Sequence, residues 1–167
     1  MASGVKSTAM PYIIDGNNLI GSSPDLSLEE EGARQKVVHI VRKFQQNRNN
    51  KVIVVFDGEP DGTAHRQELG PKFLVLYPRY GRSADDEIKR ILNSYNDFRD
   101  VVLITSDREL KAFARRLGAR TVNSIEFYFK LKREYRETGK REETQKRIDT
   151  RLSDQEVDQW MKIFNGD

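Results

Sequence analysis

The sequence contains no cysteine, so the chain forms no disulfide and offers no thiolate to zinc. This composition fits a reducing, cytoplasmic setting. Histidine is scarce as well, with only two residues among the 167. A metal ion bound to this chain would therefore meet oxygen ligands, and such ligands suit Mg²⁺ or Mn²⁺.

Long apolar runs are also missing. None approaches the ~20 residues that a membrane span needs, so we expect no membrane partner. Residues 1–10 lack the hydrophobic core of a signal peptide and are expected to form a flexible leader. With 37% hydrophobic and 33% charged residues, the chain suits one α/β domain with a real core. Its net charge of +3 is a mild preference for polyanions.

Short apolar runs alternate with amphipathic segments along residues 11–137. We expect strands over Tyr12–Ile14, Lys51–Phe56, Phe73–Tyr77, Val101–Thr105 and Arg120–Val122. Capping patterns predict helices that begin at Ser27, Ser83, Ser106 and Ser124. Residues 57–72 contain three glycines and two prolines and are expected to form a loop. This alternation predicts a parallel sheet with right-handed crossovers.

The C-terminal part of the chain differs from the rest. Residues 138–152 are charged and have no apolar periodicity, which favours an exposed linker or a frayed helix. Residues 153–167 predict a short capped helix, whose apolar stripe is Val157, Trp160, Met161 and Phe164. We expect this helix to dock on the main domain, and a partner-binding helix is the alternative.

Acidic residues follow the predicted strands. Asp15, Asp57 and Asp107 each come at the end of an apolar run, and Asp85 opens a helix. In a parallel sheet the carboxyl ends of the strands share one edge, where ligands bind. Carboxylates gathered there repel one another, so the pattern implies a bound cation, raised pKa values, or both. The resulting hypothesis is a metal-dependent phosphodiesterase.

Asp85 and Asp86 are adjacent, but their positions on the predicted helix differ. Asp85 shares a face with Ile88 and Leu92, which would point toward the sheet. Asp86 falls on the polar face and is the fourth residue of a capping pattern that begins at Ser83. We therefore expect Asp85 to be a metal ligand and Asp86, like Asp57, to be a secondary acid.

Polar, basic and aromatic residues accompany these acids. Thr105 and Ser106 could position a water molecule or a phosphate oxygen, although Ser106 also suits an N-cap. Six further residues are candidate RNA contacts through phosphates or base stacking: Arg66, Arg79, Tyr80, Arg82, Arg108 and Lys111. Scattered surface charge is the alternative interpretation of each one singly.

Four motifs together resemble a known family. They occur in the family's order within residues 11–135 and read Asp15-Gly16-Asn17-Asn18, Val55-Phe56-Asp57, Ser83-Ala84-Asp85 and Thr105-Ser106-Asp107. They resemble the NYN domain branch of the PIN-like nucleases, and within it the bacterial YacP-like group. Asn17 departs from the pattern, because that group usually has an aromatic residue there.

The resemblance implies a three-layer, Rossmann-like α/β domain with a five-stranded parallel sheet. It also implies a Mg²⁺- or Mn²⁺-dependent endoribonuclease that acts in mRNA or other RNA processing or decay. Asp15, Asp85 and Asp107 would be the metal-site acids. Asn18, the Asn of the first motif, would be a further catalytic residue that orients the attacking water or a phosphate oxygen. The partner would be single-stranded RNA or mRNA, with the ribosome as a further candidate. The alternative is a non-catalytic RNA- or ribosome-binding module with a degenerate site.

Overall fold

The computed structural model describes residues 10–60, 62, 64–97 and 100–164. The predicted leader therefore lies almost entirely outside the described residues. The chain divides into two units between Leu131 and Lys132, and each is described by itself. No helix among the described residues is long and apolar enough to cross a bilayer.

The first unit is built on a mixed six-stranded sheet with the strand order β3-β4-β2-β1-β5-β6. The strands are β1 (Tyr12–Asp15), β2 (Val52–Val55), β3 (Arg66–Gly70), β4 (Phe73–Leu76), β5 (Val102–Ile104) and β6 (Arg120–Val122). The five predicted strands pair in parallel, so the predicted parallel sheet is confirmed. The sixth strand, β3, runs antiparallel to β4 at one edge.

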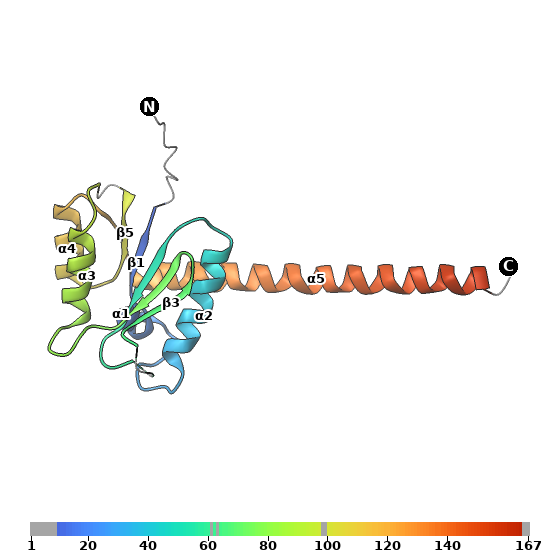
Figure 1. Ribbon diagram of the computed structural model, residues 1–167, viewed down its shortest axis with the longest axis horizontal. Helices are drawn as coiled ribbons and strands as arrows, with labels where there is room; N and C mark the ends of the chain where they lie inside the picture. Colours follow the sequence, from blue (N-terminus) through green and yellow to red (C-terminus); the bar gives the residue numbers. More distant parts are fainter. Residues whose placement is uncertain (1–9, 61, 63, 98–99, 165–167) are drawn as a thin grey trace, which may run out of the picture. The chain divides into compact units, whose positions relative to one another are not determined.

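Helices cover both faces of this sheet and form the three predicted layers (Figure 1). They are α1 (Gly16–Ser22), α2 (Ala33–Gln46), α3 (Ala84–Asn93), α4 (Arg108–Arg116) and α5 (Ser124–Phe164). One core joins α1, α2 and the first turns of α5 to the sheet, around Ile14, Val54 and Phe127. The other core joins α3 and α4 to the opposite face, around Ile13 and Leu103.

Strand β3 lies inside the segment that we expected to be a loop. Its residues alternate between exposed and half-buried positions, and Leu69 packs against the core while Arg66 and Glu68 face solvent. An edge strand buries only one face and can therefore consist mostly of polar residues. The glycines and prolines around it dominated the sequence pattern, so the loop prediction was wrong for these five residues.

Two helix starts differ from the prediction. Helix α2 begins at Ala33 rather than at Ser27, because its N-cap Gly32 adopts φ 82°, which a helix cannot contain. The pattern at Ser27 forms an isolated turn, in which its hydroxyl accepts from the N–H of Glu29. Helix α4 is capped by Asp107 and not by Ser106, since the Asp107 carboxylate accepts from the N–H of Leu110 at 2.9 Å.

Helix α1 was not predicted, and it follows β1 without a linker. Its first residue, Gly16, lies against the ring of Phe56. A Cβ at this position would come within 2.5 Å of that ring, so no larger residue fits without displacing it. Gly16 therefore allows the first turn of α1 to approach the end of β2 closely, which brings the Asp15 motif beside the Asp57 motif.

In the C-terminal part the helix α5 continues through the stretch that we expected to be an exposed linker or a frayed helix. Residues 138–150 are helical throughout, and most are exposed. They contain no proline and are rich in Glu, Lys, Arg and Gln, which favour helix without any apolar face. Val157 and Met161 are 56% and 57% exposed. The side chains of Trp160 and Phe164 lie outside the described residues, and the docking of this end remains a prediction.

Candidate functional site

The carboxyl edge of the sheet carries the four acids that the sequence singled out. Asp15 is the last residue of β1 and pairs in register with Val55, two residues before Asp57. Ile14 pairs with Ile104, so β5 reaches the same edge just before Asp107. Asp85 lies in the first turn of α3, whose Ile88 and Leu92 are buried against the sheet.

Asp15 is the most buried of the four, with 6% of its surface exposed. The Thr105 hydroxyl donates to its Oδ2 at 3.0 Å, and the N–H of Asn18 approaches its Oδ1 at 3.4 Å. Burial, with smaller contributions from the negative charges of Asp85 and Asp57, raises the pKa of Asp15 to about 6. The two hydrogen bonds work in the opposite direction. A cation beside Asp15 would therefore stabilise its ionised form.

Asp85 and Asp86 differ as the helical pattern predicts. Burial raises the pKa of the half-buried Asp85, and the carboxylates of Asp107 and Asp57 add to this shift. Asp86 is exposed and completes a capping box: its carboxylate accepts from the N–H of Ser83 at 3.0 Å, and its own N–H donates to the Ser83 hydroxyl at 3.2 Å. These bonds with Ser83 lower the pKa of Asp86.

The carboxylates of Asp57 and Asp107 are already engaged with backbone N–H groups. Asp57 accepts from the N–H of Ala84 at 2.8 Å and so holds the start of α3. The Asn17 side chain accepts from the N–H of Asp57 at 3.0 Å. Asp107 caps α4, and its own N–H donates to the Thr105 hydroxyl at 3.1 Å. Both acids keep one carboxylate oxygen for other contacts, and both add negative charge to the edge.

The predicted water- or phosphate-positioning hydroxyls have protein partners. Thr105 is completely buried and links Asp15 to Asp107, so it acts on those two acids. The Ser106 hydroxyl accepts from the N–H of Ser124 at 3.1 Å, at the beginning of α5.

Asn18 is held by both of these serines. Its side-chain oxygen accepts from the N–H of Ser106 at 2.8 Å and from the Ser124 hydroxyl at 2.6 Å. Asn18 therefore ties the end of β5 and the start of α5 to the turn that follows Asp15.

The predicted RNA contacts fall into two groups. Arg79, Tyr80, Arg82 and Arg108 are exposed, and Tyr80 is 97% exposed in the loop that precedes α3. Arg66 instead lies on β3 and pairs with Glu68 at 3.1 Å. Lys111 donates to the Asn123 side chain. Arg79, Tyr80 and Arg82 lie in the loop just before Asp85, and Arg108 is the first residue of α4, next to Asp107. Arg66 and Lys111 have side-chain partners in the protein.

The donor chemistry of this edge fits Mg²⁺ or Mn²⁺, but only in part as predicted. All four acids supply hard oxygen, and burial with neighbouring acids raises the pKa values of Asp15 and Asp85. Within the described part of the chain, however, no three Asp, Glu or His side chains form a group that could hold one ion. The metal-ligand role of Asp15, Asp85 and Asp107 stays a prediction. Mg²⁺ often binds through one or two carboxylates and keeps its remaining waters, which this arrangement allows.

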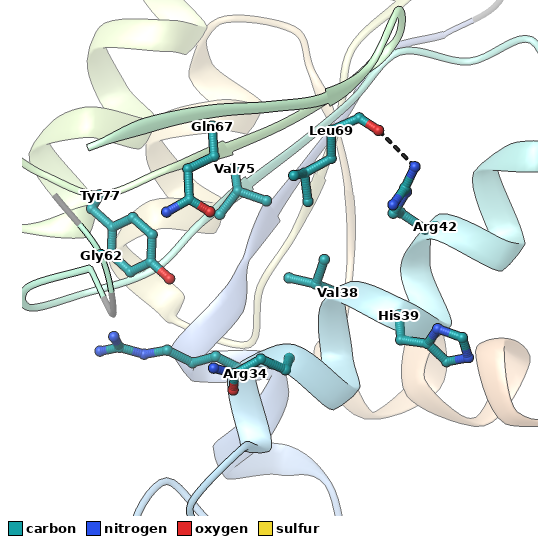
Figure 2. Close-up of a pocket in the computed structure, with 10 residues that line it drawn as sticks. Arg34, Val38, His39, Arg42, Gly62, Gln67, Leu69, Val75 and Tyr77 are labelled. Carbon is teal, nitrogen blue, oxygen red and sulfur yellow. Dashed lines mark hydrogen bonds between the residues drawn. The ribbon is translucent and has the colours of Figure 1, made fainter. Parts of the chain in front are cut away.

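A cavity of about 460 Å³ lies between α2 and the β3–β4 edge. Figure 2 shows Val38 and Arg34 of α2 opposite Leu69, Val75 and Tyr77 from the strand side. None of the predicted acids lines it. Arg34 connects the two regions, because its guanidinium donates to the backbone oxygen of Asp57 at 2.6 Å.

Sequence reasoning missed three residues that shape this edge. Asn17 joins the first motif to Asp57, and Ser124 holds Asn18. Arg34 donates to the carbonyls of Asp57 and Glu59 and thereby fixes the chain that leaves β2. The Asn-Asn pair after Asp15 was a usable signal for Asn17. No pattern in the sequence connects Arg34 or Ser124 with residues so distant along the chain.

Comparisons with known proteins agree with this fold and these motifs. The model of the YacP-like NYN domain family matches residues 12–165. The protein YacP of Bacillus subtilis (strain 168) is 28% identical over 102 residues, which are 57% of this chain and 59% of that protein's length.

Solved structures give the same result. The crystal structure of Rae1 (YacP) from Bacillus subtilis matches 94% of this chain and 95% of its own, with a TM-score of 0.64 and 21% identity. A mutant of that protein matches with a TM-score of 0.63 and 26% identity, over 79% of this chain and 80% of its own. At such identities the structures show the shared fold, and the family match covers nearly the whole chain. The chain belongs to the YacP-like NYN domain family.

Proposed function

We propose that this protein is a metal-dependent endoribonuclease that hydrolyses RNA phosphodiester bonds at the carboxyl edge of its sheet. NYN domains are typically nucleases, and the chain belongs to a family of these domains. The observation that carries the proposal is the state of Asp15: a buried carboxyl group at the edge of the sheet, with its pKa raised to about 6. A bound cation would remove the cause of the raised pKa.

Asp15 and Asp85 would hold Mg²⁺ or Mn²⁺, because their pKa values are raised by burial and neighbouring acids. When bound, the ion would lower the pKa of an attacking water and offset the charge that builds on the phosphate. Thr105 would keep the Asp15 carboxylate in place through its hydrogen bond to Oδ2. Asp107 and Asp57 would add negative charge that attracts the cation, while their hydrogen bonds to backbone N–H groups keep them fixed.

The exposed residues beside the acids would hold the RNA strand. Arg79 and Arg82 flank Tyr80 in the loop before α3, and Arg108 opens α4 next to Asp107. Arginine side chains bind phosphate oxygens, and an exposed tyrosine ring can stack on a base. Such contacts read little sequence, so the substrate would be single-stranded RNA, including mRNA. The ribosome is a candidate site of action.

The experiment is cleavage of a circular single-stranded RNA with Mg²⁺, with Mn²⁺ and with EDTA. A circle has no ends, so only an endonuclease can linearise it. We expect linear product with either metal, none with EDTA, and none from Asp15→Asn under any condition. Asp86→Asn is the matched control, because it changes a neighbouring acid whose role is to cap α3. Cleavage that continues in EDTA would contradict the proposal.

A second candidate function has support from one observation. Three of the four acids are engaged in this way: Asp15 caps α1, Asp107 caps α4 and Asp57 holds the start of α3. No three of the described acidic groups form a metal site. This arrangement also suits a non-catalytic RNA- or ribosome-binding module with a degenerate site. Such a module would bind the circular RNA without cutting it in either metal.

A further inference from the structure

The second unit of the chain contains a long exposed length of α5 with an uneven distribution of charge. Residues 132–151 carry eight Lys or Arg and five Asp or Glu. They are helical throughout, and residues 140–151 are all exposed. Charged helices of this kind are often simply solvated, so the arrangement of the charges around the helix decides whether they form a surface.

Five of the eight basic residues lie on one side of the helix. They are separated by three, four, seven and four positions, and we call them the basic stripe: Arg133, Arg136, Lys140, Arg147 and Arg151. At 3.6 residues per turn they fall within an arc of about 60° and extend over about 27 Å along the axis. No acidic residue between the two ends of the stripe falls within this arc. Glu143 lies just outside one margin and Glu137 outside the other.

The side chains of the stripe are exposed and have no partner among the described residues. All five positions are exposed, and none of the hydrogen bonds or ion pairs within the described residues uses one of these side chains. Among the described residues, nothing pairs with these positive charges. A partner that brings a row of negative charges would complement them over several turns of helix.

The composition of the same segment argues against two other kinds of partner. Its only large apolar side chains are Tyr135 and Ile148, and neither lies within the arc of the stripe. A helix that binds a membrane surface needs a broad apolar face. A stable protein interface usually has an apolar or aromatic core, which this stripe lacks. Backbone phosphates need only charge and hydrogen-bond donors.

We infer that the basic stripe of α5 binds the phosphate backbone of RNA, as a second RNA-contacting surface besides the loops at the sheet edge. The choice of RNA among polyanions rests on the proposed function. The arrangement of charges is observed independently of that function. Contacts of this kind are sequence-independent and release counterions, so the affinity would depend steeply on salt. The stripe would increase the affinity for long substrates without taking part in the cleavage step.

The test is a pair of double variants that change the same charge on different faces. Lys140→Gln with Arg147→Gln removes two charges from the stripe. Arg141→Gln with Lys146→Gln removes one lysine and one arginine from adjacent positions outside it. Both pairs are made in full-length Asp15→Asn protein, and EDTA is present so that cleavage cannot interfere. Fluorescence anisotropy of a labelled single-stranded RNA then gives the affinity at several NaCl concentrations.

A plot of log K against log[salt] has a negative slope, to which each phosphate contact on a single strand contributes about −0.7. We expect the stripe variant to lose two contacts, which makes the slope shallower by about 1.4. The control pair should leave the slope within error of the parent. Equal effects of the two pairs, or no effect of either, would overturn the inference. Loss of binding to phosphatidylserine vesicles with unchanged RNA binding would overturn it as well.

A charge-conserving variant keeps the test valid if the glutamines disturb the helix. Lys140→Arg with Arg147→Lys retains both charges and should keep the slope of the parent, with the helix content followed by circular dichroism. A shallower slope in this variant would show that the geometry of particular side chains, and not the stripe's charge, is responsible. Because cleavage is disabled in the assay, failure of the nuclease proposal would appear only with the active protein, as intact circular RNA.

Discussion

The carboxyl edge of the sheet and the basic stripe of α5 hold charges of opposite sign in opposite ways. Asp15 is 6% exposed at the edge and is fixed by Thr105, while Asp57 and Asp107 are bound to backbone N–H groups. The arginines and lysine of the stripe are exposed and have no partner among the described residues. One region confines its charge within the fold, and the other presents its charge to solvent.

This difference indicates what each region can contribute. A buried carboxylate raises the free energy of the folded protein until a cation neutralises it, so binding energy is available at a defined place. An exposed cation costs almost nothing to keep and gains only when a polyanion replaces its counterions. The carboxyl edge is therefore suited to catalysis, which needs groups in fixed positions. The basic stripe is suited to binding, which needs side chains that are accessible to a partner.

The largest expected effect concerns the acids of the edge. Asp15→Asn, Asp85→Asn and Asp107→Asn should each lower the rate of RNA cleavage at saturating Mg²⁺ by about a hundredfold or more, since even disturbing a partner of a metal ligand costs 10- to 100-fold. Asp86→Asn should change the rate little, because Asp86 caps α3 on its exposed side. Equal losses for Asp85 and Asp86 would show that exposure does not distinguish the two acids.

The next effect is on the pH dependence of the protein's stability, which Asp15 controls through its raised pKa. Asp15 ionises near pH 6 in the folded protein and near its ordinary 3.8 when unfolded. Below pH 3.8 the raised pKa does not affect the free energy of unfolding. That free energy falls as the pH rises from 3.8 to about 6, and it stays at the lower value above pH 6. Asp15→Asn should thus be more stable than the parent at pH 8, by up to a few kcal/mol, since one pKa unit is about 1.4 kcal/mol.

Urea unfolding at pH 4 and pH 8 in the presence of EDTA measures this difference. The advantage of Asp15→Asn should be small at pH 4 and large at pH 8. A pH-independent difference in the free energy of unfolding between the two proteins would show that folding does not raise the pKa of Asp15. Mg²⁺ should raise the melting temperature of the parent and leave that of Asp15→Asn nearly unchanged.

Thr105→Val tests how the edge is held together. Valine has nearly the same shape but cannot donate to Asp15 or accept from the N–H of Asp107. Leaving such buried groups unpaired costs about 1–3 kcal/mol, so the variant should unfold at a lower urea concentration. The pKa of Asp15 should rise further, because the Thr105 bond is one of the groups that lower it. An unchanged pKa, followed by NMR titration, would remove Thr105 from this role.

The smallest effect concerns the exposed arginines of the loop before α3. Arg79→Ala with Arg82→Ala should make the slope of log K against log[salt] shallower by about 1.4, as expected for the loss of two phosphate contacts on a single strand. The stability of the protein should not change, because both side chains are exposed. The matched control is Arg66→Ala, whose side chain is paired with Glu68 on β3. A slope that responds equally to both changes would mean that the loop has no special place in the RNA path.

The parts of the fold that the sequence could predict are those with a strong local signal. Runs of β-branched residues such as Val52–Val55 are buried on both faces, so periodicity and composition agree. Asp86 was recognised as a cap because its partner Ser83 is only three residues away. Strand β3 escaped prediction because an edge strand has little apolar content, and its pairing with β4 is a tertiary contact.

The candidate site was predictable in its location and less so in its details. Asp15, Asp57 and Asp107 follow strands, so topology alone brings them to one edge. That Asp57 would bind the N–H of Ala84 depends on a side-chain rotamer and on the position of α3, which no sequence pattern specifies. The ligand role of Asp15, Asp85 and Asp107 stays a prediction, and among the four acids Asp15 and Asp85 have raised pKa values.

The most direct test of the proposed metal site is a crystal of the protein soaked in Mn²⁺ and recorded near the manganese absorption edge. We predict an anomalous peak at the carboxyl edge of the sheet, within coordination distance of the carboxylates of Asp15 and Asp85. The peak should disappear in Asp15→Asn crystals and remain in Asp86→Asn crystals. A soaked crystal with no peak at this edge, or with a peak that survives Asp15→Asn, would contradict the account.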